Sequence, residues 1–394
     1  MPRLRAPLGL GTLCLGLAMA CTSMQRAVPP ADPLRVPAPA PRDAFIRITP
    51  AEAGYSEAGL DSLRRALVEA GSESMLLLHD GKVFFEWGDI RQKRLVHSMR
   101  KPLLHALIGM ASHRPCLALD ATLASLGIDD SPLPLTDAEK QATVRQVLQS
   151  RSGVYHPAAA ETDGMAAARP ARGSHAPGSF FYYNNWDFNV AGALYERCTG
   201  QRIHEAFRTQ IAEPLGMLDY RHQIIEMDGG ELPIPLTADG IRSYERQHSQ
   251  YPAYHFRLSA HDLALFGQLY LNHGRWRGRQ LVPAAWIDAG TQPVSVINAQ
   301  YGLAYGMLWD VLVPDPGEQR PAFYHTGLGV HMLGVYPSRR LVMVHRVNTE
   351  QEFRFTDASL NRIIRLMHRA RLSSPPRADT LAVDGYAGKM PVLR

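Results

Sequence analysis

Residues 97–111 read HSMRKPLLHALIGMA, and they hold the most informative pattern in the sequence. Its apolar positions recur with a helical period, so it predicts a helix that begins near Ser98. Residues three apart lie on one face of a helix, about one turn apart, so the side chains of Ser98 and Lys101 can touch. A serine hydroxyl needs a base to become a nucleophile, and a buried lysine that is neutral near pH 7 can serve as that base.

Lysine is rare in this chain, which gives the lysine at position 101 more weight. Only five of the 42 basic residues are lysine, and the other basic residues are arginine. Arginine cannot act as the base, because its guanidinium stays charged. A serine and a lysine at this spacing also occur by chance on ordinary helix surfaces, so the pattern alone does not establish a nucleophile.

Two later segments turn this pattern into a set of motifs. Residues 177–192 read PGSFFYYNNWDFNVAG, and residues 324–327 read YHTG. The segments SMRK (98–101), YNN (183–185) and HTG (325–327), in this order, resemble the SxxK, YxN and KTG-like motifs of the serine β-lactamase and penicillin-binding-protein superfamily. The resemblance is to its class C branch, which also contains DD-peptidases, carboxylesterases of the β-lactamase fold and nylon-oligomer hydrolases.

The resemblance implies an α+β fold of the β-lactamase/transpeptidase type, and it covers approximately residues 45–370. Such a fold has an antiparallel sheet flanked by helices. We therefore expect one hydrolase domain over residues 43–372, in which both ends of the chain supply the sheet. Between them, at about residues 115–250, we expect a mostly helical inserted region.

The resemblance also implies a role for each motif residue. Ser98 would attack a carbonyl carbon and become acylated, and Lys101 would take the serine proton. Tyr183 would pass the proton to the leaving group and later help to activate water, with its phenolate stabilised by the Lys101 cation. The expected substrate-binding and oxyanion-hole residues are Asn185, His325, Thr326, Gly327 and Leu328. Asn185 would orient Lys101, and the backbone N–H groups of Ser98 and Leu328 would stabilise the oxyanion. The resemblance implies no metal ion and no organic cofactor.

Two positions depart from the family pattern. His325 stands where the family has a lysine, which removes a permanent positive charge and weakens the case for a dedicated β-lactamase that grips a carboxylate. Pro102 follows Lys101 directly, and proline has no N–H to donate to the carbonyl four residues earlier. We therefore expect a locally distorted first turn at Ser98.

The segments around the motifs have clear local signals. Residues 56–71 have a helical period, with Ser56 as the N-cap. Two apolar runs, Ser74–Leu78 and Val83–Trp87, flank Asp80-Gly81, which predicts a β-hairpin. Further expected helices are 137–149, 186–199, 203–211, 260–272 and 356–371, and further expected strands are 301–309, 322–325, 330–336 and 341–347.

The N-terminus has the pattern of an export signal. Two arginines precede an apolar stretch of 15 residues, which predicts a signal peptide over residues 1–20. The sequence LAMA before Cys21 resembles a bacterial lipobox, so we expect acylation of Cys21 and a Pro-rich tether over residues 21–42 that holds the domain near a membrane. The expected location is the periplasmic face of a membrane, with the outer membrane favoured. Cleavage after Ala20, which gives a soluble periplasmic protein, is the alternative. Residues 373–394 are expected to form a loose tail.

Composition and charge exclude several classes of protein. The 394 residues are 45% hydrophobic and 20% charged, which is typical of a globular chain and not of a disordered or multi-pass membrane protein. The net charge of +5 comes without a long basic run, which argues against nucleic-acid binding. No CxxC, Cys/His ligand spacing or HExxH motif supports a metal site. An oxidising periplasm permits a disulfide between Cys116 and Cys198, but nothing in the sequence places them together, so we expect two free buried thiols.

These observations predict a lipid-anchored serine hydrolase that forms an acyl-enzyme on Ser98 and hydrolyses an ester or amide bond of a small molecule or peptide. A DD-peptidase or β-lactamase that acts on cell-wall peptides or β-lactams is the alternative within the same class. A catalytically silent binding protein on the same fold is the alternative from another class. An intact set of Ser98, Lys101 and Tyr183 argues against the binding protein, since a site that no longer catalyses a reaction has no chemical need for all three.

Overall fold

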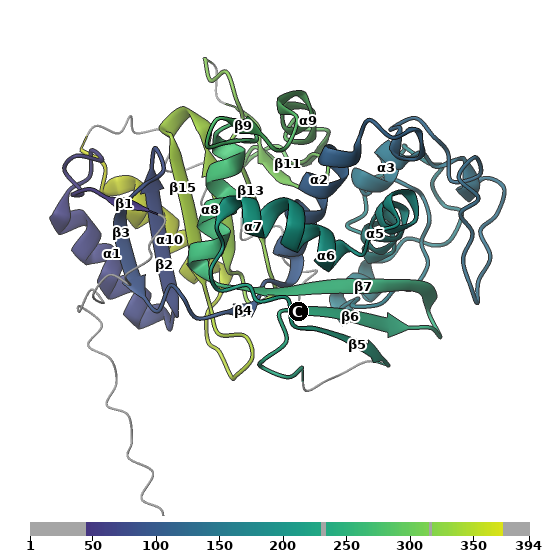
Figure 1. Ribbon diagram of the computed structural model, residues 1–394, viewed down its shortest axis with the longest axis horizontal. Coiled ribbons are helices and arrows are strands. Elements are labelled where there is room, and N and C mark those ends of the chain that lie inside the picture. Colours follow the sequence, from purple (N-terminus) through teal and green to yellow (C-terminus); the bar gives the residue numbers. More distant parts are fainter. Residues whose placement is uncertain (1–44, 230–233, 315–316, 373–394) are drawn as a thin grey trace, which may run out of the picture.

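Two β-sheets and the helices between them form the part of the chain that the computed structural model describes, residues 45–229, 234–314 and 317–372 (Figure 1). The larger sheet has nine strands, in the spatial order β1 (Ile46–Arg47), β3 (Lys82–Gly88), β2 (Ser74–His79), β15 (Leu341–Arg346), β14 (Met332–Tyr336), β13 (Phe323–Thr326), β12 (Asp310–Leu312), β11 (Leu303–Tyr305) and β10 (Ser295–Asn298). The smaller sheet has four strands, in the order β4 (Arg94–Leu95), β7 (Ser249–Leu258), β6 (Gly240–Glu245) and β5 (Ile224–Asp228). A separate two-stranded ribbon joins β8 (Arg275–Trp276) and β9 (Arg279–Gln280).

Three long helices cover the larger sheet. α1 (Glu57–Ala70) and α10 (Asp357–Arg369) pack together on one face, and α8 (Ala260–Leu271) lies against β15, β14 and β2 on the other (Figure 1). Side chains of β2 alternate between the two faces, as the pleat of a strand requires. Leu76 and Leu78 belong to the core that α8 covers, and Met75 and Leu77 belong to the core under α1 and α10.

The other helices of the described residues lie mostly between the two sheets and around them. They are α2 (Arg100–Ala111), α3 (Val144–Leu148), α4 (Asp163–Ala168), α5 (Asn185–Thr199), α6 (Ile203–Phe207), α7 (Glu213–Leu215) and α9 (Ala284–Gly290). α2 packs against α5, and α5 packs in turn against β7. Within the described ranges, no helix combines the length and the apolar character needed to cross a bilayer.

The first hairpin and its preceding helix are as predicted. Ser56 caps α1, and its side chain accepts a hydrogen bond from the N–H of Gly59. β2 and β3 pair in antiparallel register. Asp80 and Gly81 have φ angles of 51° and 74°, the left-handed conformation that a tight two-residue hairpin turn requires.

The inserted region also holds strands that the sequence analysis does not predict. Residues 115–250 contain α3 to α7 together with β5, β6 and the start of β7. The helix expected over 137–149 is a short 3₁₀ turn followed by α3, and the strand expected over 301–309 shrinks to β11. The signal peptide, Cys21, the tether and the C-terminal tail lie outside the described residues.

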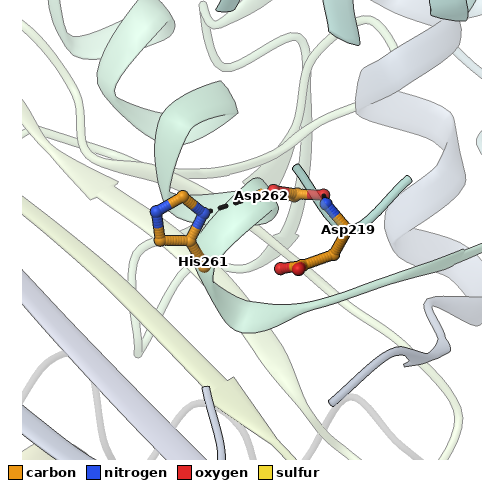
Figure 2. A group of neighbouring side chains, drawn as sticks. All are labelled: Asp219, His261 and Asp262. Carbon is orange, nitrogen blue, oxygen red and sulfur yellow. Dashed lines mark hydrogen bonds and ion pairs between the residues drawn. The ribbon is translucent and has the colours of Figure 1, made fainter. Parts of the chain in front are cut away.

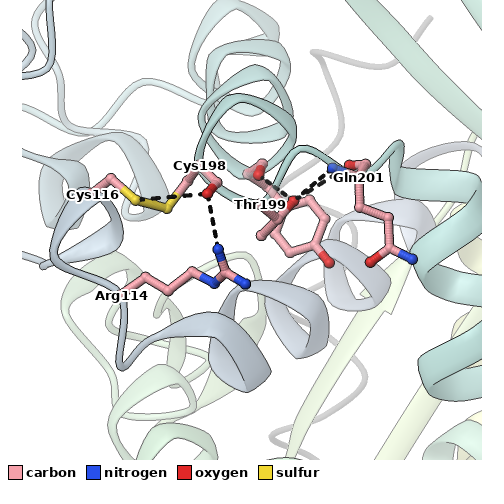
Figure 3. The surroundings of a disulfide bond; sticks show 6 residues. Arg114, Cys116, Cys198, Thr199 and Gln201 are labelled. Atoms are coloured by element: carbon pink, nitrogen blue, oxygen red, sulfur yellow. Dashed lines mark hydrogen bonds between the residues drawn. A yellow bond between two sulfur atoms is a disulfide. The ribbon is translucent and has the colours of Figure 1, made fainter.

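The expectation of two free thiols is also wrong. Cys116 and Cys198 form a disulfide, with their Cα atoms 5.8 Å apart (Figure 3). The bond joins the turn after α2 to the last turn of α5, and Arg114 donates to the carbonyl of Cys198 at 3.2 Å beside it. The two cysteines are 82 residues apart in sequence, and only the packing of α5 against this turn brings them together.

The two sheets meet at the segment that leads to Ser98. β4 pairs with β7, and the N–H of Val96 donates to the carbonyl of Phe256 at 2.9 Å. Arg346 on β15 is fully buried. Its guanidinium donates to three backbone carbonyls of the smaller sheet, those of Arg94, Leu95 and Leu258. These bonds fix the backbone before Ser98 relative to the larger sheet.

Candidate active site

Ser98 lies on a single 3₁₀ turn, His97–Met99, between β4 and α2. The N–H of Arg100 donates to the carbonyl of His97, which is the 3₁₀ pattern. Pro102 stands in the first turn of α2, where its missing N–H costs little. The predicted distortion of this turn is therefore confirmed. His97 has a φ of 45°, a conformation that persists only where the surrounding structure holds it.

The contact predicted between Ser98 and Lys101 is present. Lys101 Nζ lies 3.0 Å from Ser98 Oγ, and the lysine side chain is fully buried. Nζ also lies 4.7 Å and 4.4 Å from the ring centroids of Tyr183 and Phe188. Burial, and then the charge of Arg100, hold the pKa of Lys101 well below its usual range. The amine is therefore suited to be neutral and to accept a proton.

Tyr183 approaches the site from the segment just before α5, and its ring centroid lies 4.7 Å from Lys101 Nζ. Burial raises the pKa of Tyr183 above its usual range, while Ser98 and the charge of Arg100 act in the opposite direction. The sequence predicts a phenolate beside a Lys101 cation, but a neutral lysine offers no such charge. The resting Tyr183 is instead a neutral hydroxyl that can donate a proton.

The two asparagines after Tyr183 have different tasks. Asn184 is the N-cap of α5, and its side chain accepts a backbone N–H of the first turn. The side-chain amide of Asn185 donates to the carbonyl of Ala160. In the described structure no hydrogen bond joins Asn185 to Lys101, so the predicted orienting contact is not present.

β13 brings the HTG segment against the nucleophile's turn. A Cβ on Gly327 would lie 2.5 Å from the carbonyl oxygen of Val96 and would also collide with the ring of His331. Glycine therefore permits β13 to pack directly on the chain before the nucleophile. His325 is buried, and its Nδ1 lies 2.8 Å from the carbonyl oxygen of Thr326.

A cavity of about 460 Å³ opens beside Ser98. Asn185 and Leu328 line it together with Ser98, whereas Lys101, which contacts Ser98, and Tyr183 do not line it. One wall comes from the smaller sheet and its approach, and consists of Leu95, Ile234, Ile241, Ser243, Glu245 and His255. A further part of the wall comes from the segment before and within α4, and consists of Ala160, Glu161, Thr162 and Met165. The cavity thus gives an outside molecule access to a serine that has a buried amine beside it.

Comparison with known protein families assigns the chain to a family. The model of the beta-lactamase family matches residues 61–365. The chain belongs to the beta-lactamase family.

Solved structures share the fold of this beta-lactamase-family chain. A protein described as a 6-aminohexanoate-dimer hydrolase from Bacillus anthracis is 17% identical, with a TM-score of 0.57, over 81% of this chain and 85% of its own. A penicillin-binding protein homologue from Caulobacter crescentus is 20% identical, with a TM-score of 0.52, over 75% and 93%. A class C beta-lactamase in complex with cefoxitin is 15% identical, with a TM-score of 0.52, over 76% and 94%. No curated protein sequence matches the chain. The family and these relatives are mostly serine hydrolases, which supports a hydrolase.

Sequence reasoning missed part of the site of this beta-lactamase-family chain. The residues Ser243, Glu245 and His255 line the cavity from β6 and β7, two strands that the sequence analysis does not predict. Arg100 also lines the cavity, and it stands inside the SMRK segment itself. The available signal was its place in the sequence between Ser98 and Lys101.

Figure 2 shows a group of three potential metal ligands elsewhere in the described residues, formed by Asp219, His261 and Asp262. The carboxylate of Asp262 already accepts three backbone N–H groups, those of residues 218–220. The carboxylate of Asp219 accepts the hydroxyl of Ser259 at 2.7 Å. These protein donors satisfy the carboxylates, so the group braces the loop before β5 against the start of α8, and we derive no metal chemistry from it.

Proposed function

We propose that this chain is a serine hydrolase that forms an acyl-enzyme on Ser98 and hydrolyses an ester or amide bond. The observation that carries the proposal is the distance of 3.0 Å between Lys101 Nζ and Ser98 Oγ, with the lysine fully buried. A buried amine that has lost its charge is a base, and a serine within hydrogen-bond distance of it is a nucleophile.

The proposed reaction begins when Ser98 Oγ attacks the substrate carbonyl carbon and its proton passes to Lys101 Nζ. The backbone N–H groups of Ser98 and Leu328 stabilise the oxyanion that forms. The neutral hydroxyl of Tyr183 then donates its proton to the leaving oxygen or nitrogen, and Tyr183 recovers a proton from Lys101. The bond to the leaving group breaks, and the acyl group stays on Ser98. Water then gives a proton to Lys101 and attacks the acyl carbon, the bond to Ser98 Oγ breaks, Oγ takes that proton back, and the acid leaves.

The HTG segment supports an ester or a neutral amide over a substrate held by its carboxylate. His325 is buried against its own strand and does not line the cavity. At the one position of the KTG-like motif where the family has a lysine, this chain has His325 and so lacks that permanent charge. DD-peptidase or β-lactamase activity therefore remains the second candidate, and the assay below includes substrates for both.

The test is hydrolysis of p-nitrophenyl butyrate by the wild type and by Ser98→Ala, with Ser112→Ala as a matched control. The Ser112 hydroxyl bonds the Gly109 carbonyl at the far end of the same helix, so its loss leaves the site intact. We expect the wild type and Ser112→Ala to be active and Ser98→Ala to be inactive. Equal activity of all three contradicts the assignment of Ser98.

A second measurement separates a narrow enzyme from a binding protein. A fluorophosphonate labels only an activated serine, so its mass is expected on the peptide that contains Ser98. Labelling without ester hydrolysis, followed by turnover of nitrocefin or of a D-Ala-D-Ala peptide, moves the assignment to the second candidate. Absence of labelling under conditions in which the fold is intact favours the binding protein.

We also propose that the chain is exported and anchored through an acylated Cys21. The support is the N-terminal pattern, together with the Cys116–Cys198 disulfide, since disulfides persist in oxidising compartments such as the periplasm. The test is metabolic labelling with an alkyne-tagged fatty acid, which is expected to mark the wild type and to leave Cys21→Ala unmarked. A soluble, unlabelled wild type in the periplasmic fraction contradicts the anchor.

A further inference from the structure

Arg100 is a buried cation without an acidic partner. The side chain is 2% exposed. Its guanidinium donates to the carbonyl of Tyr254 at 3.3 Å and to Asn189 Oδ1 at 3.5 Å, and it lies 4.8 Å from the centroid of the Tyr254 ring. Among the described residues no carboxylate is one of the groups that shift the pKa of Arg100, which burial lowers from its usual value. Burial of a charge without a counterion is costly, so the position calls for a compensating role.

The position of Arg100 gives it such a role in the proposed reaction. It directly precedes Lys101 at the start of α2, and it lines the same cavity as Ser98. Both basic side chains are buried, so water and salt screen the repulsion between them only weakly. A fixed positive charge here disfavours a second positive charge on Lys101 and favours a negative charge on Tyr183. The directions of the pKa shifts agree: the charge of Arg100 lowers the pKa of both groups.

We propose that Arg100 is a positioning residue for the proton, whose permanent charge keeps the Lys101 amine free to accept the Ser98 proton and helps Tyr183 to release its own. This inference rests on the proposed function and goes beyond it, because Arg100 acts through Lys101 and Tyr183 and needs no contact with the substrate. Only arginine suits the task, since its guanidinium keeps its charge at every pH at which the enzyme is assayed.

Other titratable and charged groups face Lys101 from the elements packed around it. Substitutions of these groups can therefore test the prediction in both directions. The titratable and charged groups are His97 and Arg100 on its own turn, Tyr183 before α5, Tyr254 and His255 on β7, and Asp310 on β12. Asp310 opposes Arg100, because its negative charge raises the pKa of Lys101. Loss of Arg100 and loss of Asp310 must therefore move the protonation of Lys101 in opposite directions.

The experiment measures kcat/KM for the ester against pH, in the range where activity rises as Lys101 loses its proton. Arg100→Gln removes the charge, and Asn189→Asp keeps Arg100 and gives it a counterion at the atom that it already contacts. Both are expected to move the rising limb to higher pH by about one unit, the usual effect of one charge at close range. Asp310→Asn is expected to move the limb to lower pH. Asn189→Ala is the matched control, because it removes the side-chain bonds of Asn189 to Arg100 and Ala159 without adding charge, and it must leave the limb in place.

The outcomes separate this inference from the proposed function. If Arg100→Gln or Asn189→Asp is folded and has an unmoved limb, with only KM changed, Arg100 binds substrate or braces α2 and the inference is wrong. Should Arg100→Gln fail to fold, Asn189→Asp still decides the matter, because it retains the Arg100 side chain. Persistence of activity in Ser98→Ala overturns the proposed function itself, whatever the pH profiles show.

Discussion

Removal of the Cys116–Cys198 disulfide is expected to lower the stability of the folded domain without abolishing activity at room temperature. The bond closes a loop over a sequence separation of 82 residues. Loop-closure entropy for a loop of that length corresponds to about 4.5 kcal/mol of stabilisation, an upper value because unfolded chains retain some structure. For a domain of this size that amounts to a loss of about 6 °C in Tm.

Activity should survive because the disulfide is remote from the reacting groups. It lies in the last turn of α5, whereas Tyr183 precedes the first turn, and a helix of 15 residues is about 22 Å long. The assay is thermal unfolding, followed by circular dichroism, of Cys116→Ser/Cys198→Ser and of the wild type with and without dithiothreitol. The reductant should lower the wild-type Tm to that of the variant and leave the variant unchanged. An unchanged Tm in the double variant, or alkylation of both cysteines in the denatured, unreduced wild type, would refute the reasoning.

Two further substitutions test the electrostatics of the buried groups. Lys101→Met is expected to lower ester hydrolysis by about 10²–10⁴-fold, the contribution of a general base, and to leave Tm unchanged or raised, because methionine fills the space beside the Tyr183 and Phe188 rings without a buried amine. A large fall in Tm would show that the lysine is structural. Asp187 is fully buried, and burial raises its pKa well above the usual range. Because the folded protein holds this proton more tightly than the unfolded chain does, the stability that Asp187 contributes is complete below about pH 4 and is lost as pH rises through the folded pKa. As pH rises from 5 to 8, the free energy of unfolding measured in urea should therefore fall less for Asp187→Asn than for the wild type. An equal fall in both proteins would contradict the assigned shift.

Local signals in the sequence predicted the elements whose turns and ends depend only on neighbouring residues. Asp80-Gly81 predicted the hairpin because only a few residues accept the left-handed turn, and Ser56 predicted the start of α1 because its hydroxyl replaces a missing helical partner. The pair of Ser98 and Lys101 was predictable for the same reason, since helical spacing alone brings them together.

Features that depend on distant packing were not predictable in this way. β6 lacks the clean alternation of a half-buried strand, whereas β7 alternates Tyr254, Phe256 and Leu258 with His255 and Arg257, and this signal was overlooked. The wall of the cavity that they form was therefore missed as well. The disulfide was missed because its two cysteines meet only after α5 has packed, and no local pattern encodes that contact.

The backbone around Ser98 shows why a serine and a lysine at the right spacing are rarely a catalytic site. The strained φ of His97 needs a support, which the hydrogen bond of 2.8 Å from its Nε2 to Thr349 Oγ1 supplies from a segment some 250 residues away in sequence. Arg346 anchors the preceding strand to the larger sheet, and Gly327 lets β13 lie directly against that strand. An oxyanion hole needs donors that are fixed before the reaction begins. In the proposed site that fixation comes from the contacts between the two sheets, so the motif supplies the side chains that we propose to react and the rest of the chain supplies their geometry.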